Sequence, residues 1–115
     1  MNLLLVDDNE ACIETLADIA TSLGHTAAIA YDGAGCLALT SHTRFDRIFL
    51  DISLPDADGR DICSRIRAAG LSRDARIIAM TGHSDFVDGS GETEFDGYLL
   101  KPISLQALEL FLLTR

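Results

Sequence analysis

The sequence lacks most features that mark a membrane, secreted or nucleic-acid-binding protein. No apolar run approaches the ~18 residues that a membrane-spanning helix needs, so we expect no membrane segment. The first residues, MNLLLVDDNE, have no basic region and reach two acids too early for a signal peptide, which predicts a cytoplasmic protein. Basic residues are scarce: nine lysines and arginines face 18 acids, and the net charge of −9 argues against nucleic-acid binding.

Cysteine and histidine are also few, and neither forms a recognisable pattern. The three cysteines lie far apart and match no CxxC spacing: Cys12, Cys36 and Cys63. We expect them to be reduced thiols that are mostly buried. The three histidines are equally dispersed and show no zinc-binding spacing: His25, His42 and His83.

Short apolar segments alternate along the chain with segments of helical periodicity. We expect strands at residues 3–6, 26–30, 47–51, 75–81 and 96–101. We expect helices at residues 13–23, 33–42, 60–70 and 104–115, with Ser104 as the N-cap of the last. A further helix within residues 84–97 should be short or irregular, because glycines and acids are frequent there.

The expected strands are apolar throughout rather than alternating, which indicates burial on both faces of a sheet. Strands that alternate with helices through short connections favour a parallel sheet covered by helices on both sides. The sequence therefore predicts an α/β fold with a doubly wound parallel sheet, built from five strand–helix units. Its 115 residues suit a single domain that spans residues 1–115.

Polar residues stand at the carboxyl ends of four expected strands, where open parallel sheets bind their ligands. They are Asp7 and Asp8 after the first strand, Asp51 in the third, Thr81 in the fourth, and Lys101 with Pro102 at the fifth. Lys101 is the only lysine in the chain. One such acid could simply form a turn. The whole set predicts a single crevice that holds three carboxylates, a hydroxyl and an ammonium group.

Four motifs, VDDN, LDISLPDADG, IIAMTG and DGYLLKPIS, resemble those of the receiver domain of two-component response regulators. The resemblance covers essentially the whole chain and implies the flavodoxin-like strand order 2-1-3-4-5. It also implies that Asp51 is the phosphoacceptor, which takes a phosphoryl group from a phosphohistidine. The partner that carries this phosphohistidine would be a histidine kinase or a histidine phosphotransfer protein.

The resemblance also assigns roles to the other residues of the crevice. Mg²⁺ or Mn²⁺ would be held by Asp8, Asp51 and the backbone carbonyl of Ser53, with Asp7 acting through a bound water. Thr81 and Lys101 would hold the phosphoryl oxygens. Tyr98 would be the switch aromatic, and the peptide bond between Lys101 and Pro102 would be cis. These roles agree with elementary electrostatics, since clustered carboxylates need a hard cation and phosphoryl transfer needs positive charge at its oxygens.

Two other functions are compatible with parts of this pattern. A phosphatase of the haloacid dehalogenase class also uses a strand-end aspartate, but it requires an acid two residues later, where this chain has Ser53. A degenerate receiver would act only as a protein-binding module or as a phosphate shuttle that does not switch. Such a receiver usually lacks an acid, the threonine or the lysine, and this chain retains all of them. We therefore expect no enzyme activity beyond the chain's own phosphorylation and dephosphorylation.

The segment between Thr81 and Lys101 departs from the usual receiver pattern. It is slightly short, Gly82 replaces a small residue such as alanine, and further glycines follow at 89, 91 and 97. In this family the fourth helix, fifth strand and fifth helix form the usual face for a downstream partner, so the glycines leave this face open to question. The chain could be a stand-alone regulator or part of a longer protein, and DGYLLKPIS slightly favours the receiver of a hybrid histidine kinase.

Overall fold

The computed structural model describes residues 1–82 and 95–113 of the chain. Within these ranges, strands and helices follow one another in the predicted order. The elements are β1 (Asn2–Val6), α1 (Glu10–Ser22), β2 (Thr26–Ala30), α2 (Gly33–His42), β3 (Arg47–Asp51), α3 (Gly59–Ala68), β4 (Arg76–Thr81), β5 (Gly97–Leu100) and α4 (Leu105–Leu113).

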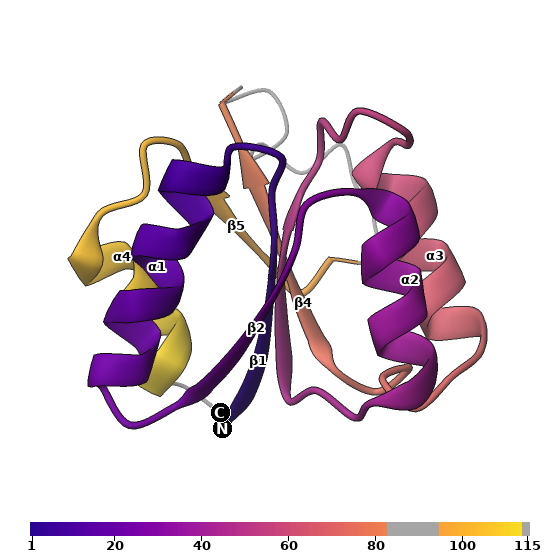
Figure 1. Cartoon of the computed structure of the whole chain (residues 1–115), viewed down its shortest axis with the longest axis horizontal. Helices are drawn as coiled ribbons and strands as arrows, with labels where there is room; N and C mark the ends of the chain where they lie inside the picture. Colours follow the sequence, from indigo (N-terminus) through magenta and orange to yellow (C-terminus); the bar gives the residue numbers. More distant parts are fainter. Residues whose placement is uncertain (83–94, 114–115) are drawn as a thin grey trace.

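The five strands form one parallel sheet in the order β2-β1-β3-β4-β5, which confirms the predicted topology. Helices α1 and α4 cover one face of the sheet, and α2 and α3 cover the other (Figure 1). The chain therefore has the doubly wound, flavodoxin-like fold. The additional helix expected within residues 84–97 falls mainly on residues 83–94, which lie outside the described part of the chain.

The sheet separates two hydrophobic cores, because successive side chains of a strand point to opposite faces. Leu3, Leu5 and Phe49 belong to the core beneath α1 and α4. Leu4 and Leu50 belong to the core beneath α2 and α3. The central strand β3 is buried along its whole length, which the apolar run from Ile48 to Leu50 predicted for the middle of the strand but not for Arg47 at its start.

Helix ends differ from the predicted ones in ways that local chemistry explains. Leu23 was expected on the buried face of α1, but it is the C-cap residue and is 45% exposed. Gly24 follows with a φ of +95°, a conformation that glycine adopts without strain. Helix α3 ends at Ala68, two residues before the predicted glycine. The predicted N-cap of α4 is confirmed, since the Ser104 hydroxyl accepts the Ala107 N–H at 3.1 Å.

Two residues interrupt the regular packing. Gly97 opens β5 so close to α4 that a Cβ atom there would lie 2.5 Å from Cε1 of Phe111. Arg47, at the start of β3, is only 4% exposed. Its Nη1 atom is buried and has no hydrogen-bond partner among the described residues.

Within the described ranges, none of the three cysteines is part of a disulfide bond, and Cys36 and Cys63 are buried. Among the helices of the described ranges, none combines the length and the apolar character that crossing a membrane requires.

Candidate functional site

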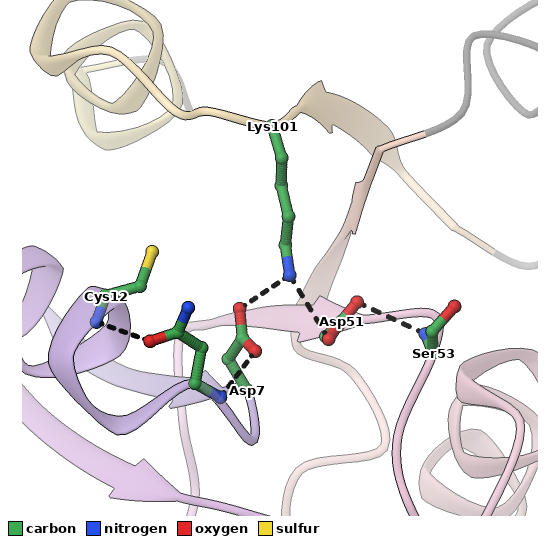
Figure 2. Close-up of polar contacts among 6 residues, drawn as sticks. Asp7, Cys12, Asp51, Ser53 and Lys101 are labelled. Atoms are coloured by element: carbon green, nitrogen blue, oxygen red, sulfur yellow. Dashed lines mark hydrogen bonds and ion pairs between the residues drawn. The ribbon is translucent and has the colours of Figure 1, made fainter.

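The predicted crevice forms at the carboxyl edge of the sheet. Asp7 and Asp8 follow β1, Asp51 ends β3, and Lys101 follows β5. One carboxylate oxygen from each of the three acids lies within 4.8 Å of the other two. The lysine ammonium points toward Asp7 and Asp51 and forms ion pairs with both (Figure 2). Parallel strands thus bring together four residues from three widely spaced parts of the sequence.

Asp7 is held in place by bonds to both of its oxygens. Its side chain is 1% exposed, Oδ1 accepts the Asn9 N–H at 3.0 Å, and Oδ2 lies 2.8 Å from Nζ of Lys101. Asn9 is the N-cap of α1, and its own side chain accepts the N–H of Cys12 at 3.1 Å. The turn between β1 and α1 therefore fixes Asp7 and starts the helix with the same few residues.

Asp51 is buried at the end of β3, with 4% of its surface exposed. Its Oδ2 lies 3.2 Å from Nζ of Lys101, and its Oδ1 accepts the N–H of Ser53 at 3.2 Å (Figure 2). The next loop returns closely to this point, because a Cβ atom on Gly59 would lie 2.7 Å from the carbonyl oxygen of Asp51. Glycine at position 59 therefore allows α3 to begin directly against the end of β3.

The three charged groups shift one another's protonation equilibria. For Asp51, burial and the nearby charge of Asp7 raise the pKa above its ordinary value, and Lys101 offsets only part of this effect. For Asp7, burial opposes ionisation, but the Asn9 N–H and Lys101 outweigh it and the pKa is lowered. For Lys101, burial also opposes the charged form, yet the two carboxylates raise its pKa. The site therefore holds more negative charge than one ammonium group can balance.

The residues of the cluster fit a hard divalent cation. Carboxylate oxygens are the preferred ligands of such ions, and Asp7, Asp8 and Asp51 each offer one. Asp8 is exposed to solvent, so its carboxylate is accessible. Apart from the ion pair with Lys101, Oδ2 of Asp7 is buried and has no hydrogen-bond partner among the described residues. This oxygen could therefore accept a further hydrogen bond, for example from a water bound to the cation.

Thr81 and Lys101 are linked through the backbone. Thr81 ends β4, is 3% exposed, and its carbonyl accepts the N–H of Lys101 at 2.7 Å. The peptide bond between Lys101 and Pro102 is cis, as predicted.

Tyr98 is half-buried on β5, and its ring meets that of Phe95 edge to face, with 6.0 Å between centroids.

Two residues near the site were given no role from the sequence alone. Asn9 was part of the VDDN motif, and an asparagine just before a helical segment is a recognised N-cap signal. Asp56, in the loop after Asp51, accepts hydrogen bonds from Gly33 and Ala34 of α2. No sequence pattern indicates that contact, because it joins residues more than 20 positions apart.

Comparison with known proteins agrees with this geometry. The sequence model of the family described as "Response regulator receiver domain" matches residues 3–112. The chain belongs to this family. Receiver domains act in two-component signalling, where their general role is to accept a phosphoryl group, and they are signalling domains rather than conventional enzymes.

Individual receiver domains show how far the similarity extends. The response regulator MprA of Mycobacterium ulcerans is 32% identical over 111 residues, covering 94% of this chain and 47% of that protein. This chain thus spans about half the length of the curated relatives it matches. The receiver domain of sensor histidine kinase PA1611 from Pseudomonas aeruginosa, solved with a coordinated magnesium ion, is 30% identical with a TM-score of 0.84. That match covers 96% of this chain and 93% of the other.

A response regulator from Burkholderia pseudomallei, solved with a phosphorylated aspartic acid and a calcium ion, is 28% identical with a TM-score of 0.85. The match covers 98% of this chain and 66% of that one. Receiver domains of two kinds, one from a sensor kinase and one from a response regulator, therefore share this fold.

Proposed function

We propose that Asp51 is the residue that accepts the phosphoryl group and that the receiver domain extends over residues 1–115. The observation that carries this proposal is the position of its carboxylate, at the end of the central strand and 3.2 Å from the only lysine of the chain. A carboxylate attacks an anionic donor only where positive charge screens the approach. Lys101 supplies such charge beside Asp51.

The cation would be Mg²⁺, or Mn²⁺ in its place. It would be held by Asp7, Asp8, Asp51 and the backbone carbonyl of Ser53. The cation would neutralise charge that develops on the phosphoryl oxygens. Two observations support this choice: the carboxylate cluster of this chain, and the magnesium ion coordinated in the active-site cleft of the similar Pseudomonas aeruginosa receiver domain. Asp7, held by Asn9 and Lys101, would orient a water in the shell of the ion.

Lys101 and the hydroxyl of Thr81 would bind the oxygens of the transferred group. A hydrogen bond from Thr81 to the phosphorylated side chain would draw the threonine inward, and Tyr98 would turn to fill the space it leaves. Such a charge-assisted bond is worth ~1.5–3 kcal/mol, which is comparable to a typical allosteric coupling energy. The face formed by β5 and α4 would then change shape for a downstream partner.

The donor would be a phosphohistidine of a histidine kinase or of a histidine phosphotransfer protein in the cytoplasm. The domain would catalyse its own phosphorylation and the loss of its phosphoryl group, and no other reaction. A receiver that passes its phosphate onward without switching would use the same site. The two alternatives differ at Tyr98, whose ring should move only in a receiver that switches.

The proposal is tested by incubating the protein with acetyl phosphate and Mg²⁺ and measuring its intact mass. We expect a gain of one phosphate in the wild-type protein and none in Asp51→Asn. Asp8→Ala should bind Mg²⁺ much more weakly in calorimetry. Undiminished labelling of Asp51→Asn would show that another residue is the acceptor.

A further inference from the structure

Asp56 connects the loop that follows Asp51 to a separate helix. It lies between β3 and α3, and its carboxylate accepts the first two backbone N–H groups of α2. Gly33 N lies 2.7 Å from Oδ1, and Ala34 N lies 3.0 Å from Oδ2. The bonds from Gly33 and Ala34 lower the pKa of Asp56, so this carboxylate is charged at neutral pH. A charged acceptor at a helix N-terminus makes a favourable contact with the helix dipole.

Helix α2 already has a cap of its own. Its N-cap residue Asp32 accepts the N–H of Gly35 at 2.7 Å through its side chain and the N–H of Cys36 at 3.1 Å through its carbonyl. Removal of Asp56 would therefore leave α2 with its N-cap residue. The loop after Asp51, by contrast, would lose its two hydrogen bonds to α2.

The loop approaches α2 so closely that a side chain at position 33 would force its neighbours to shift. A Cβ atom on Gly33 would lie 3.1 Å from Oδ1 of Asp56, 3.2 Å from Cβ of Ala57 and 2.9 Å from Cδ1 of Ile62. Gly33 therefore allows Asp56 to reach the backbone of α2.

The same loop connects Asp56 to Asp51 through Ser53. Ser53 lies three residues before Asp56, and its N–H donates to Oδ1 of Asp51 at 3.2 Å. Other bonds of the loop stay local: Gly59 N–H donates to the carbonyl of Ile52 at 2.7 Å, and Ser53 pairs with Asp58 in an antiparallel bridge. These bonds make the loop compact, whereas the bonds of Asp56 fix the compact loop against α2.

We infer that Asp56 is a positioning residue for phosphorylation. It anchors the loop to α2, and the anchored loop fixes Ser53. The Ser53 N–H then holds the Asp51 carboxylate, and the Ser53 carbonyl keeps the orientation that the reaction requires. The inference rests on the proposed role of Asp51. It assigns to α2, which contributes no residue to the crevice, a part in holding the acceptor. Loss of the contact should act on both cation binding and transfer, because Ser53 would serve both.

The test compares Asp56→Ala with Asp32→Ala. Both variants remove one negative charge and hydrogen-bond acceptors from the N-terminus of α2, but only the first releases the loop. We expect Asp56→Ala to lower Mg²⁺ affinity, measured by calorimetry, and the initial rate of labelling by acetyl phosphate, each by ~10-fold, as supporting residues of metal sites commonly do. Amide exchange at Ser53 should become faster in the same variant. Asp32→Ala should lose thermal stability while its Mg²⁺ affinity stays within about twofold of wild type.

Equal Mg²⁺ affinity, labelling and Ser53 exchange in the two variants would overturn the inference and leave Asp56 as a second cap of α2. A wild-type protein that takes up no phosphate would overturn the proposed function as well, so the two failures are distinguishable. Should Asp56→Ala not fold, Asp56→Asn keeps one oxygen acceptor and should show a smaller change in the same direction. Gly33→Ala, which pushes the loop away from α2, should also reduce Mg²⁺ affinity.

Discussion

Lys101 forms an ion pair with Asp7 across the carboxyl edge of the sheet, with 2.8 Å between Nζ and Oδ2. The same ammonium group lies 3.2 Å from Asp51 and is therefore shared between the two acids. Asp7 would bind a water molecule that coordinates the cation, and Asp51 would be phosphorylated. A cation that enters the cluster therefore meets a positive charge already present there.

We expect Lys101→Met to bind Mg²⁺ more tightly than wild type and to be labelled more slowly. Removal of a unit charge a few ångströms from the cation should raise affinity roughly tenfold. Loss of a positive donor to the transferred oxygens should slow labelling by ~10²-fold. Calorimetry and intact mass measure the two effects separately. Lys101→Arg keeps the charge and serves as the control; a fall in Mg²⁺ affinity in Lys101→Met would contradict the prediction.

The raised pKa of Asp51 makes stability depend on pH. The folded protein binds this proton more tightly than the unfolded chain, so stability is lost as the pH rises from the ordinary value of 3.8 through the raised value. Asp51→Asn does not undergo this loss. Without metal, it should melt several degrees above wild type at pH 7, and the difference should disappear near pH 3.

Thermal melts with a chelator at constant ionic strength measure this difference. The lowered pKa of Asp7 acts in the opposite direction, since its contribution is lost as the pH falls, but Asp7 is present in both proteins. A difference in melting temperature that does not change with pH would show that Asp51 is not destabilised by ionisation.

Tyr98 provides a direct measurement of switching. With a beryllofluoride mimic and Mg²⁺, we expect the ring to leave its edge-to-face contact with Phe95 and to become more buried. Ring resonances in NMR spectra report this change. Tyr31, 41% exposed and bonded to Glu14 at 2.9 Å, is the internal control and should not respond. Thr81→Ala should suppress the response, and an unchanged Tyr98 would favour a phosphate shuttle.

Arg47 is expected to reduce the stability of the fold. Its Nη1 is buried without a hydrogen-bond partner among the described residues, and a buried charge that lacks full pairing is costly. Arg47→Met, which keeps the length of the side chain, should raise the free energy of unfolding by ~1 kcal/mol or more. Arg73→Met is the matched control, since Arg73 is also an arginine but is exposed. Equal melting temperatures of the two variants would refute the prediction.

The sequence predicted the fold because the strands contain short apolar runs and helices such as α1 and α3 are periodic, and these two signals are local. It predicted Asp7, Asp51 and Lys101 as neighbours because parallel strands end at a common edge. The sequence could not show which acid Lys101 approaches more closely, since both lie within its reach and the balance depends on distances of a few tenths of an ångström. Nor could it show the burial of Arg47, because a charged residue at the start of a strand is usually exposed.

The contact of Asp56 with α2 was missed for a different reason. Its loop, PDADG, contains two acids, and the pattern of a turn before a helix suits both of them. Asp58 caps α3, the helix that follows it, through the N–H of Arg60 at 2.8 Å. Asp56 instead bonds to a helix that precedes it in the chain, which depends on how α2 and the loop pack together and leaves no local signal.

The contact between Gly97 and Phe111 restricts the order in which the two positions can change over evolution. A Cβ atom at position 97 would lie 2.5 Å from Cε1 of the ring, so any first substitution there forces the ring or α4 to shift. A smaller side chain at position 111 removes the obstacle at the cost of some packing. A lineage that acquires alanine at 97 must therefore lose the aromatic ring at 111 first, and once both have changed, the return of the ring is blocked in turn.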